Sequence, residues 1–279
     1  MKAYTTEDGH VVVFRPDMNA KRMVDTATRL EIPPFPVERF VDAVEQVVKA
    51  NLEYVPPFGT GAALYIRPVL FATGAVMGVK PATEYQFRIF VSPVGPYFKN
   101  GGSNSIVLKV SDYDRSAPHG TGHIKAGLNY AMSLYPIVKA HEEGFNENMY
   151  LDPQTRTKVE ETGGANFFFV TKDNKVVTPK SPSILPSITR RSLMALAKDL
   201  GYETEEREVY LDELGDFAEC GLCGTAAVIS PVGALVYKGE EITINNFQIG
   251  ELTQKLYDYL TGIQWGKVED KYGWARLVK

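Results

Sequence analysis

The sequence predicts a mixed α/β protein, with intermixed helices and strands, in two domains. The chain has 279 residues, of which 44% are apolar and 23% charged, a globular composition with length for one large or two ordinary domains. Short β-branched or alternating runs, typical of strands, intermix with longer stretches of helical periodicity and show no steady βαβ rhythm. A segment rich in Gly, Pro and Ser, Ser92–Ser105, interrupts this pattern and indicates a domain boundary.

The first domain is placed at residues 1–95. A helix is possible over 18–30, before three prolines break the chain. A second helix is expected over 37–48, because apolar residues recur there on one helical face. Strands are expected at 11–14, 62–70 and 84–91.

Residues 96–105 are assigned as a linker and 106–279 as the second, larger domain. Buried strands are predicted at 106–110, 166–170 and 226–229. Helices are predicted at 126–140, around the apolar face of 193–200, and at 247–260.

Charge and cysteine content exclude several classes of protein. Thirty Lys and Arg against 34 Asp and Glu give a net charge of −4, too balanced for a general attraction to nucleic acid or an anionic membrane. No apolar run is long enough to span a membrane, and the first residues contain no apolar signal core. Two cysteines make no disulfide framework. We therefore expect a soluble, cytoplasmic enzyme or binding protein that acts on small molecules, with no nucleic-acid or membrane partner.

Metal chemistry is not expected. The four histidines show no HxxxH or HExxH spacing, and Cys220 and Cys223 form a single CxxC without the second pair that a closed zinc site requires. Ordinary buried thiols are the favoured interpretation of both cysteines.

One loop draws attention to a lysine. Gly120–Gly127 combines glycines with Lys125, but its spacing is wrong for a phosphate-binding P-loop. Small residues beside Lys125 would permit close approach of a planar group, and Tyr130 would lie about one helical turn further on. A solvated lysine at the start of a helix is the simpler alternative.

Three further segments suggest a companion site. Glu161 leads a Gly-rich turn into an apolar strand, and Pro186-Ser187 is typical of a helix start, which would leave the amides of Ile188 and Thr189 as donors for a phosphate. The segment Gly224–Ala227 offers a second set of amides. A lysine for a Schiff base, a carboxylate for a pyridinium nitrogen and a helix start for a phosphate suit pyridoxal 5′-phosphate. From spacing alone this is one interpretation among several.

Together these motifs resemble those of the branched-chain amino acid aminotransferases, which are class IV, fold-type IV pyridoxal-phosphate enzymes. The resemblance runs in order along essentially the whole chain. It implies a small α/β domain and a larger cofactor domain with a pseudo-barrel of strands. The matching segments are Phe14–Pro16, Tyr65–Pro68, Lys125–Tyr130, Glu161–Phe168 followed by Val176–Thr178, Leu185–Arg190 and Gly224–Ala227.

The resemblance implies a role for each matching residue. Lys125 matches the catalytic lysine that binds the cofactor, Tyr130 the tyrosine near the cofactor 3-hydroxyl, and Glu161 the carboxylate paired with the ring nitrogen. The phosphate-binding group matches Arg15, Ile188, Thr189 and Thr225. The substrate-binding group matches Tyr65 and Arg67, reaching in from the small domain, and the amides of Thr225 and Ala226, which would receive the α-carboxylate.

The sequence also departs from the family pattern. Leu128 stands where many members have a second glycine, and Cys220 and Cys223 precede Gly224, so they do not match the redox CxxC of mammalian members. The usual N-terminal segment, which completes the small domain, is expected to be absent.

The implied reaction is transamination between leucine, isoleucine or valine and 2-oxoglutarate, with a homodimer as the expected assembly. The alternatives are a D-amino acid aminotransferase, an aminodeoxychorismate lyase, or a shortened form that binds cofactor without turnover. For single residues, the alternatives are a turn-capping Glu161, a surface ion pair at Arg15, and structural roles for Tyr65 and Arg67.

Overall fold

The computed structural model describes residues 1–95 and 105–278, which form two compact units: Met1–Gly95 with Thr261–Lys279, and Pro96–Leu260. Most of the predicted linker, 96–104, lies outside the described residues. The predicted second domain ran to residue 279, and here the structure differs. Strand β14 (Ala275–Leu277) pairs with β2 (Val11–Phe14), so backbone hydrogen bonding places the chain end in the first unit.

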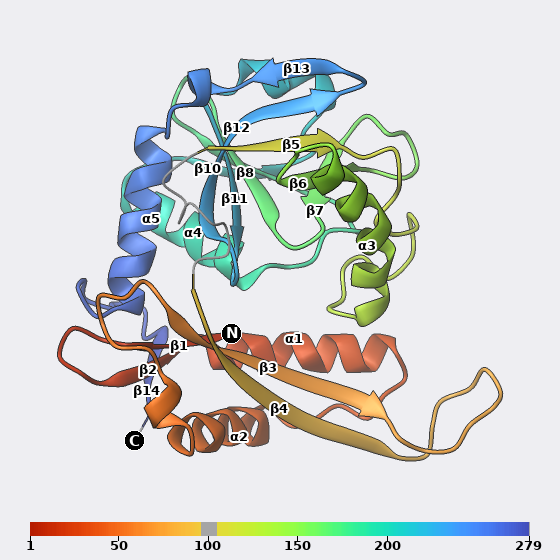
Figure 1. The fold of residues 1–279 in the computed structure, drawn as a ribbon, viewed down its shortest axis with the longest axis vertical. Coiled ribbons are helices and arrows are strands. Elements are labelled where there is room, and N and C mark those ends of the chain that lie inside the picture. Colours follow the sequence, from red (N-terminus) through yellow and green to blue (C-terminus); the bar gives the residue numbers. More distant parts are fainter. Residues whose placement is uncertain (96–104, 279) are drawn as a thin grey trace. The chain divides into compact units, whose positions relative to one another are not determined.

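The first unit is a five-stranded sheet, in the order β14-β2-β1-β3-β4, packed against two helices (Figure 1). Val41, Val44 and Val48 of the second helix share a core with Leu64 and Ile66 of the sheet. Apolar residues at helical spacing on one side and alternating residues on the other therefore explain this core. The remaining elements are β1 (Lys2–Thr5), α1 (Pro16–Arg29), α2 (Val37–Lys49), η1 (Leu52–Tyr54), β3 (Ala63–Ala72) and β4 (Tyr85–Val94).

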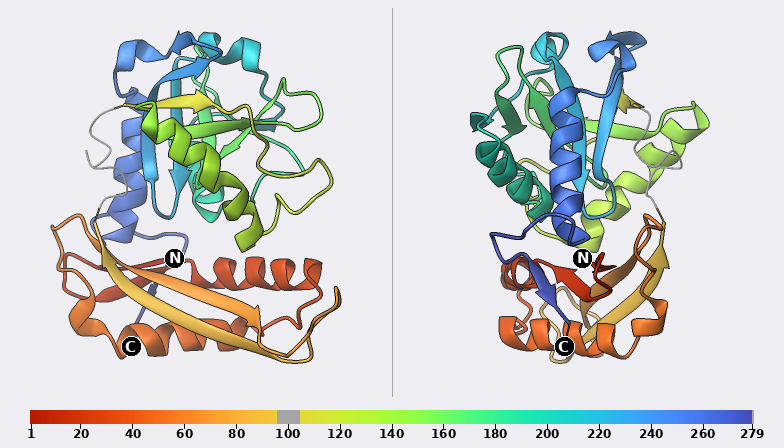
Figure 2. Two further views of the ribbon diagram at one scale, coloured as in Figure 1. Left: turned by 45° about the vertical axis from the view of Figure 1, so that its right-hand side comes forward. Right: turned by 90° about the vertical axis from the view of Figure 1, so that its left-hand side faces the viewer.

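The second unit is built on six strands that close into a barrel, because β7 pairs with both β6 and β8 (Figure 2). Around the barrel the order is β8-β11-β12-β5-β6-β7, with β9 and β10 extending it beyond β8 and β13 pairing with β12. The pseudo-barrel implied by the resemblance is thus confirmed. Its strands are β5 (Ile106–Val110), β6 (Glu147–Leu151), β7 (Val159–Thr162), β8 (Asn166–Val170), β9 (Val176–Pro179), β10 (Thr204–Arg207), β11 (Glu219–Gly224), β12 (Val228–Tyr237) and β13 (Glu240–Thr243).

The helices of the second unit are α3 (Gly127–Glu142), η2 (Leu211–Asp216), α4 (Ile188–Asp199) and η3 (Asn245–Phe247), and α5 (Glu251–Gln264) continues into the first unit. Two predicted elements need correction. The strand expected at 226–229 begins only at Val228, since Ala226 and Ala227 lie in a turn, and the helix expected at 247–260 begins at Glu251. In both places apolar residues that the pattern assigned to an element belong to the turn before it.

The centre of the barrel is aromatic. Phe167, Phe168 and Phe169 on β8 are all fully buried, with Phe167 and Phe169 on one face and Phe168 on the other. Gly221 on β11 faces Phe168, and a Cβ there would lie 2.3 Å from the ring, so only glycine fits. Within the described residues, no helix combines the length and apolar character needed to cross a bilayer.

Candidate active site

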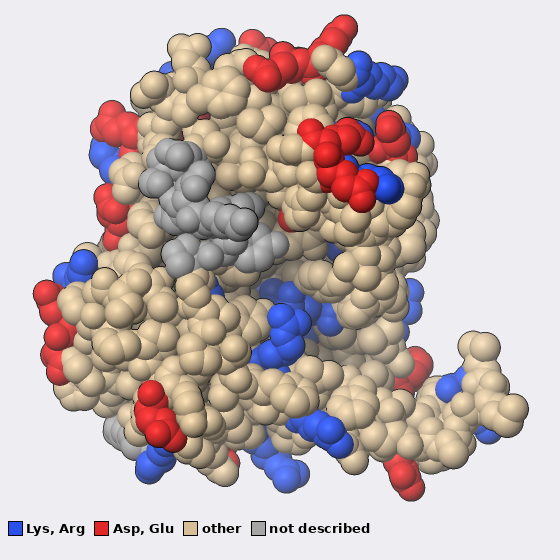
Figure 3. Space-filling view, in the orientation of Figure 1, with Lys and Arg blue, Asp and Glu red and all other residues tan. Residues whose placement is uncertain are grey.

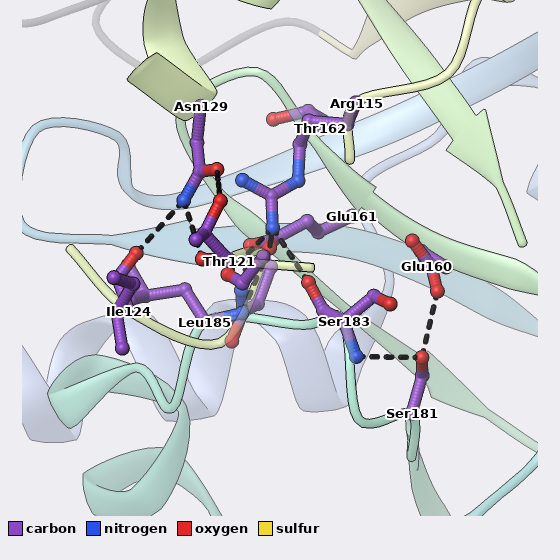
Figure 4. A network of polar contacts seen from close by, with 12 residues as sticks. Arg115, Thr121, Ile124, Asn129, Glu160, Glu161, Thr162, Ser181, Ser183 and Leu185 are labelled. Carbon is purple, nitrogen blue, oxygen red and sulfur yellow. Dashed lines mark hydrogen bonds and ion pairs between the residues drawn. The ribbon is translucent and has the colours of Figure 1, made fainter. Parts of the chain in front are cut away.

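Lys125 lies in the loop that leads into α3, and its neighbours hold that loop in place. Asn129 donates from Nδ2 to the carbonyls of Thr121 (2.7 Å) and Ile124 (2.9 Å), and it accepts a hydrogen bond from the Thr121 hydroxyl at 2.8 Å (Figure 4). The Lys125 amine donates to the Tyr130 hydroxyl at 2.6 Å. The predicted pair of Lys125 and Tyr130 is therefore close in space, and the lysine side chain is exposed.

Glu161 lies at the opposite extreme of exposure, 3% exposed on β7. A tight turn follows, in which the Thr162 hydroxyl accepts from the amides of Gly164 and Ala165 at 3.2 and 2.9 Å. This turn sets Asn166 opposite Glu161, and Asn166 Nδ2 donates to Glu161 Oε2 at 2.6 Å. The carboxylate is thus fixed by the turn that the Gly-rich sequence predicted.

The charge of Glu161 depends on its neighbours. Burial raises its pKa from 4.5 to about 7, while Arg115, the amide of Leu185 and Lys125 act to lower that pKa, and Glu160 raises it. Lys125 is close enough to influence the carboxyl electrostatically, so the structure brings these two predicted residues into one site.

The start of α4 is tied to the same carboxylate. Leu185 N donates to Glu161 Oε1 at 2.8 Å, and three residues later α4 begins. The Ser187 hydroxyl caps the helix by accepting from Arg190 N at 3.2 Å. Hydrogen bonds within the helix begin at Arg191 N, so the helix itself does not use the amides of Ile188 and Thr189.

Thr225 and Ala226 lie in the turn between β11 and β12. Cys223, two residues before Thr225, pairs in register with Asn166, and Glu161 influences the pKa of the Cys223 thiol. The turn is therefore adjacent to the Glu161 turn. Val228 closes it with φ of 58°, a conformation that a β-branched side chain rarely adopts. Such strain persists where surrounding structure enforces it, often at ligand-binding sites.

Arg15, Tyr65 and Arg67 belong to the first unit. Arg15 precedes α1 with φ of 47°, and its guanidinium lies 4.6 Å from the centre of the Trp274 ring. Tyr65 and Arg67 share one face of β3, with the guanidinium 5.1 Å from the tyrosine ring centre, while Leu64 and Ile66 face the core. The roles implied for these three residues, and for those of the second unit, remain predictions.

Three polar residues near the site were missed by the sequence analysis: Arg115, Asn129 and Asn166. Each is buried, at 4%, 1% and 3% exposed, and each bonds to a segment that carries a predicted site residue. Their only sequence signal is position, ten residues before and four after Lys125, and five after Glu161. Which backbone groups they meet is decided by tertiary structure.

The cysteines are free, buried thiols. Among residues 1–95 and 105–278, no three His, Cys, Asp or Glu side chains gather in a way that could hold a metal ion.

We expect thiol reagents to label neither cysteine in the native protein. Burial raises the pKa of Cys223 to about 12 and that of Cys220 well above its ordinary value, so neither forms the reactive thiolate. Ellman titration should find two thiols only after denaturation. A rapidly reacting thiol in the folded protein would contradict this prediction.

The chemistry of this donor set fits pyridoxal 5′-phosphate. An exposed amine, a hydroxyl bonded to it, a buried carboxylate and helix-start amides are the groups that the cofactor's aldehyde, phenol, ring nitrogen and phosphate require. In addition, Asn166 Oδ1 and Arg115 Nε are buried beside Glu161 without a hydrogen-bond partner in the described part of the chain. Polar atoms left in this way indicate a site that a polar ligand completes.

Comparison with known proteins agrees with this chemistry. The family described as amino-transferase class IV matches residues 1–235. The branched-chain-amino-acid aminotransferase of Haemophilus influenzae is 51% identical over 286 residues, covering 100% of this chain and 83% of that protein. The branched-chain amino acid aminotransferase of Escherichia coli is a structural relative, with a TM-score of 0.85 at 29% identity, covering 100% of this chain and 88% of that one.

A thermophilic relative has been solved with a form of the cofactor. This branched-chain amino acid aminotransferase, in complex with pyridoxamine 5′-phosphate, superposes with a TM-score of 0.87 at 26% identity, covering 100% of this chain and 88% of that one. A family match over most of the chain and a curated relative at 51% identity settle the family. The chain belongs to the class IV aminotransferases and, within them, to the branched-chain amino acid aminotransferases.

Proposed function

We propose that this chain transfers amino groups between the branched-chain L-amino acids leucine, isoleucine and valine and 2-oxoglutarate, with pyridoxal 5′-phosphate as cofactor. The observation that carries the proposal is the joint placement of Lys125 and Glu161, an exposed amine and a buried carboxylate within electrostatic reach. The relative solved with pyridoxamine 5′-phosphate, also solved with a phosphopyridoxyl adduct of L-glutamate, supports the same cofactor and one of the substrates.

The protein's part in the reaction is to hold the cofactor and move a proton. When bound, the cofactor supplies a ring that takes up the electrons left on the substrate Cα when its proton leaves. Lys125 Nζ binds the cofactor covalently, is released by the incoming amino group, and then carries the proton between substrate and cofactor carbon. Glu161 holds a proton on the ring nitrogen, which makes the ring a better electron acceptor. Tyr130, bonded to Lys125, lies beside the cofactor 3-hydroxyl.

Binding of the phosphate and of the substrate is divided between the two units. We assign the phosphate to Arg15, the amides of Ile188 and Thr189, and Thr225. The substrate α-carboxylate is assigned to the amides of Thr225 and Ala226. Arg67, beside Tyr65 on β3, suits the second carboxylate of glutamate because a guanidinium binds a carboxylate with two parallel hydrogen bonds.

A substrate panel tests this function. The purified protein is supplied with 2-oxoglutarate and either leucine, isoleucine or valine, and glutamate formation is measured. Comparable turnover of all three is expected, because a difference of one methylene changes the binding free energy by only about 1–3 kcal/mol. D-Alanine and aminodeoxychorismate are the comparison substrates. Turnover of either of these without leucine turnover would assign another class IV activity, and bound cofactor without any turnover would indicate an inactive form.

We further propose that the enzyme is a homodimer joined through α3. Large apolar side chains on this helix are 48–64% exposed: Leu128, Met132, Leu134, Tyr135 and Val138. In Figure 3 the surface over α3 is largely uncharged, with charged side chains gathered toward one end. An apolar patch of this kind favours a protein partner, and a second copy of the chain supplies the same patch across a two-fold axis.

Sedimentation equilibrium should therefore give twice the mass of the chain. Leu134→Glu places a charge in the interface and is expected to shift the protein to monomer. Leu52→Glu is the control, since Leu52 is 46% exposed on η1 of the other unit. A monomeric wild type, or equal behaviour of the two variants, would refute this interface.

We place the enzyme in the cytoplasm. Both cysteines are free thiols, the state that a reducing compartment maintains. Cell fractionation with an antibody against the protein tests this placement.

A further inference from the structure

Arg115 is a buried cation that the motif comparison left without a role. Its side chain is 4% exposed and forms an ion pair with Glu161 Oε1. Nη2 also donates to the carbonyl oxygens of Gly122, at 2.8 Å, and Ser183, at 2.6 Å. Figure 4 shows the guanidinium directed at the carboxylate, between these segments.

Those contacts connect the two ends of the cofactor site. Gly122 is three residues before Lys125, and Ser183 is two residues before Leu185, whose amide also donates to Glu161. One side chain therefore bonds to the loop of the catalytic lysine, to the segment that leads into α4, and to the carboxylate for the ring nitrogen.

The backbone is shaped to allow this convergence. A Cβ on Gly122 would lie 2.1 Å from the Ser183 carbonyl oxygen and 2.5 Å from Ser116 Oγ. Only a glycine lets the two carbonyl groups approach closely enough to share the Arg115 guanidinium. The absence of a side chain at Gly122 is thus part of the construction of the site.

A purely structural explanation is weak in energetic terms. Removing two charges from water costs several kcal/mol for each ion, and replacing a buried ion pair by apolar residues often stabilises a protein. A site that needs an ionised carboxylate has a reason to keep the pair, because a buried carboxyl without a cation drifts towards its neutral form.

We propose that Arg115 is a positioning residue of the cofactor site, which keeps Glu161 ionised and oriented for the protonated ring nitrogen of pyridoxal phosphate. The inference rests on the proposed cofactor role of Glu161. Arg115 acts through the carboxylate and does not itself meet the substrate. Its presence allows the cofactor to bind at neutral pH without first removing a proton from the site.

The charged groups around the carboxylate determine the sign of the expected pH effect. Arg115 is the main cation facing Glu161, Lys125 adds a smaller effect of the same sign, and Glu160 opposes both. Cys223 and Tyr150 are the other titratable neighbours, and both have pKa values raised by burial, so they stay neutral near pH 7. Loss of an opposite charge this close raises an acid's pKa by about 1–3 units.

The test measures the dissociation constant of pyridoxal phosphate for the cofactor-free full chain by fluorescence quenching between pH 6 and 9. In the wild type, binding should strengthen as Glu161 loses its proton and then level off. In Arg115→Gln that midpoint should move up by about one pH unit or more, so affinity at pH 7 falls about tenfold or more and recovers at higher pH. In the double variant R115Q/E161Q the pH dependence should vanish.

Three further variants make the result decisive. Arg115→Lys keeps the charge but not the planar fork, and should retain the wild-type midpoint with weaker binding. Arg115→Met removes the charge while filling the space, and replaces R115Q if that variant fails to fold. Arg156→Gln is the control: Arg156 donates to Asp114 Oδ1 at 2.6 Å and Ser111 O at 2.7 Å, just before Arg115, and has no contact with Glu161.

The outcomes separate this proposal from the proposed function. If R115Q weakens binding equally at every pH, as a loss of packing would, Arg115 is only structural and the inference is overturned. If Glu161→Gln alone leaves cofactor affinity unchanged at all pH values, the cofactor role of Glu161 itself is wrong. An upward shift in R115Q and R115M that the E161Q background abolishes supports both.

Discussion

Replacement of Lys125 by alanine is expected to reduce turnover by on the order of 10⁴-fold, because the same amine binds the cofactor and transfers the proton. The variant should still fold, since Lys125 is exposed and alanine suits the loop before α3. Glutamate formation from leucine and 2-oxoglutarate measures the loss. Mass spectrometry after borohydride treatment measures the covalent adduct, which should be present in the wild type on the peptide containing Lys125 and absent from K125A.

Lys172→Ala is the matched control for this experiment. Lys172 is a 73% exposed lysine of the same unit, and its nearest acid, Asp216, lies 3.8 Å away. This variant should retain both activity and the adduct. Borohydride fixation of cofactor to K125A would show that another amine carries it, and the catalytic assignment of Lys125 would be wrong.

Glu161→Gln should be the second most damaging change, with turnover reduced by on the order of 10²–10³-fold. Glutamine retains the size of the side chain and can still accept from Asn166 and Leu185. It carries no charge, however, so it cannot hold the proton on the ring nitrogen, and it leaves Arg115 buried without its counter-ion. Turnover and thermal unfolding, measured together, separate the loss of catalysis from any loss of stability.

Glu208→Gln is the matched control, because Glu208 is an exposed glutamate of the same unit that pairs with Lys158 at 2.7 Å. Surface ion pairs contribute only about 0–1 kcal/mol, so this variant should keep its activity and nearly all of its stability. Equal activity of E161Q and wild type would remove Glu161 from the mechanism.

The sequence was most informative where local chemistry dominates. Apolar periodicity predicted α2 and the strand at Ile106–Val110, and the Phe167–Phe169 run predicted a buried strand, because burial of one face or of a whole strand leaves its period in the chain. Prediction failed at short strands such as β14, which has three residues and exists only through its pairing with β2. Three residues carry too little pattern to indicate a strand.

The candidate site divides in the same way. Lys125, Glu161 and the capped start of α4 could be found from the sequence, because an amine beside glycines, a carboxylate before a Gly-rich turn and a Pro-Ser pair each carry a local signal. The meeting of Arg115 with Gly122, Ser183 and Glu161 could not be found, because these residues are up to 68 positions apart and only the folded barrel brings them together. Sequence thus determined which reactive groups the protein has, and tertiary structure decided the burial and the neighbouring charges that set their protonation.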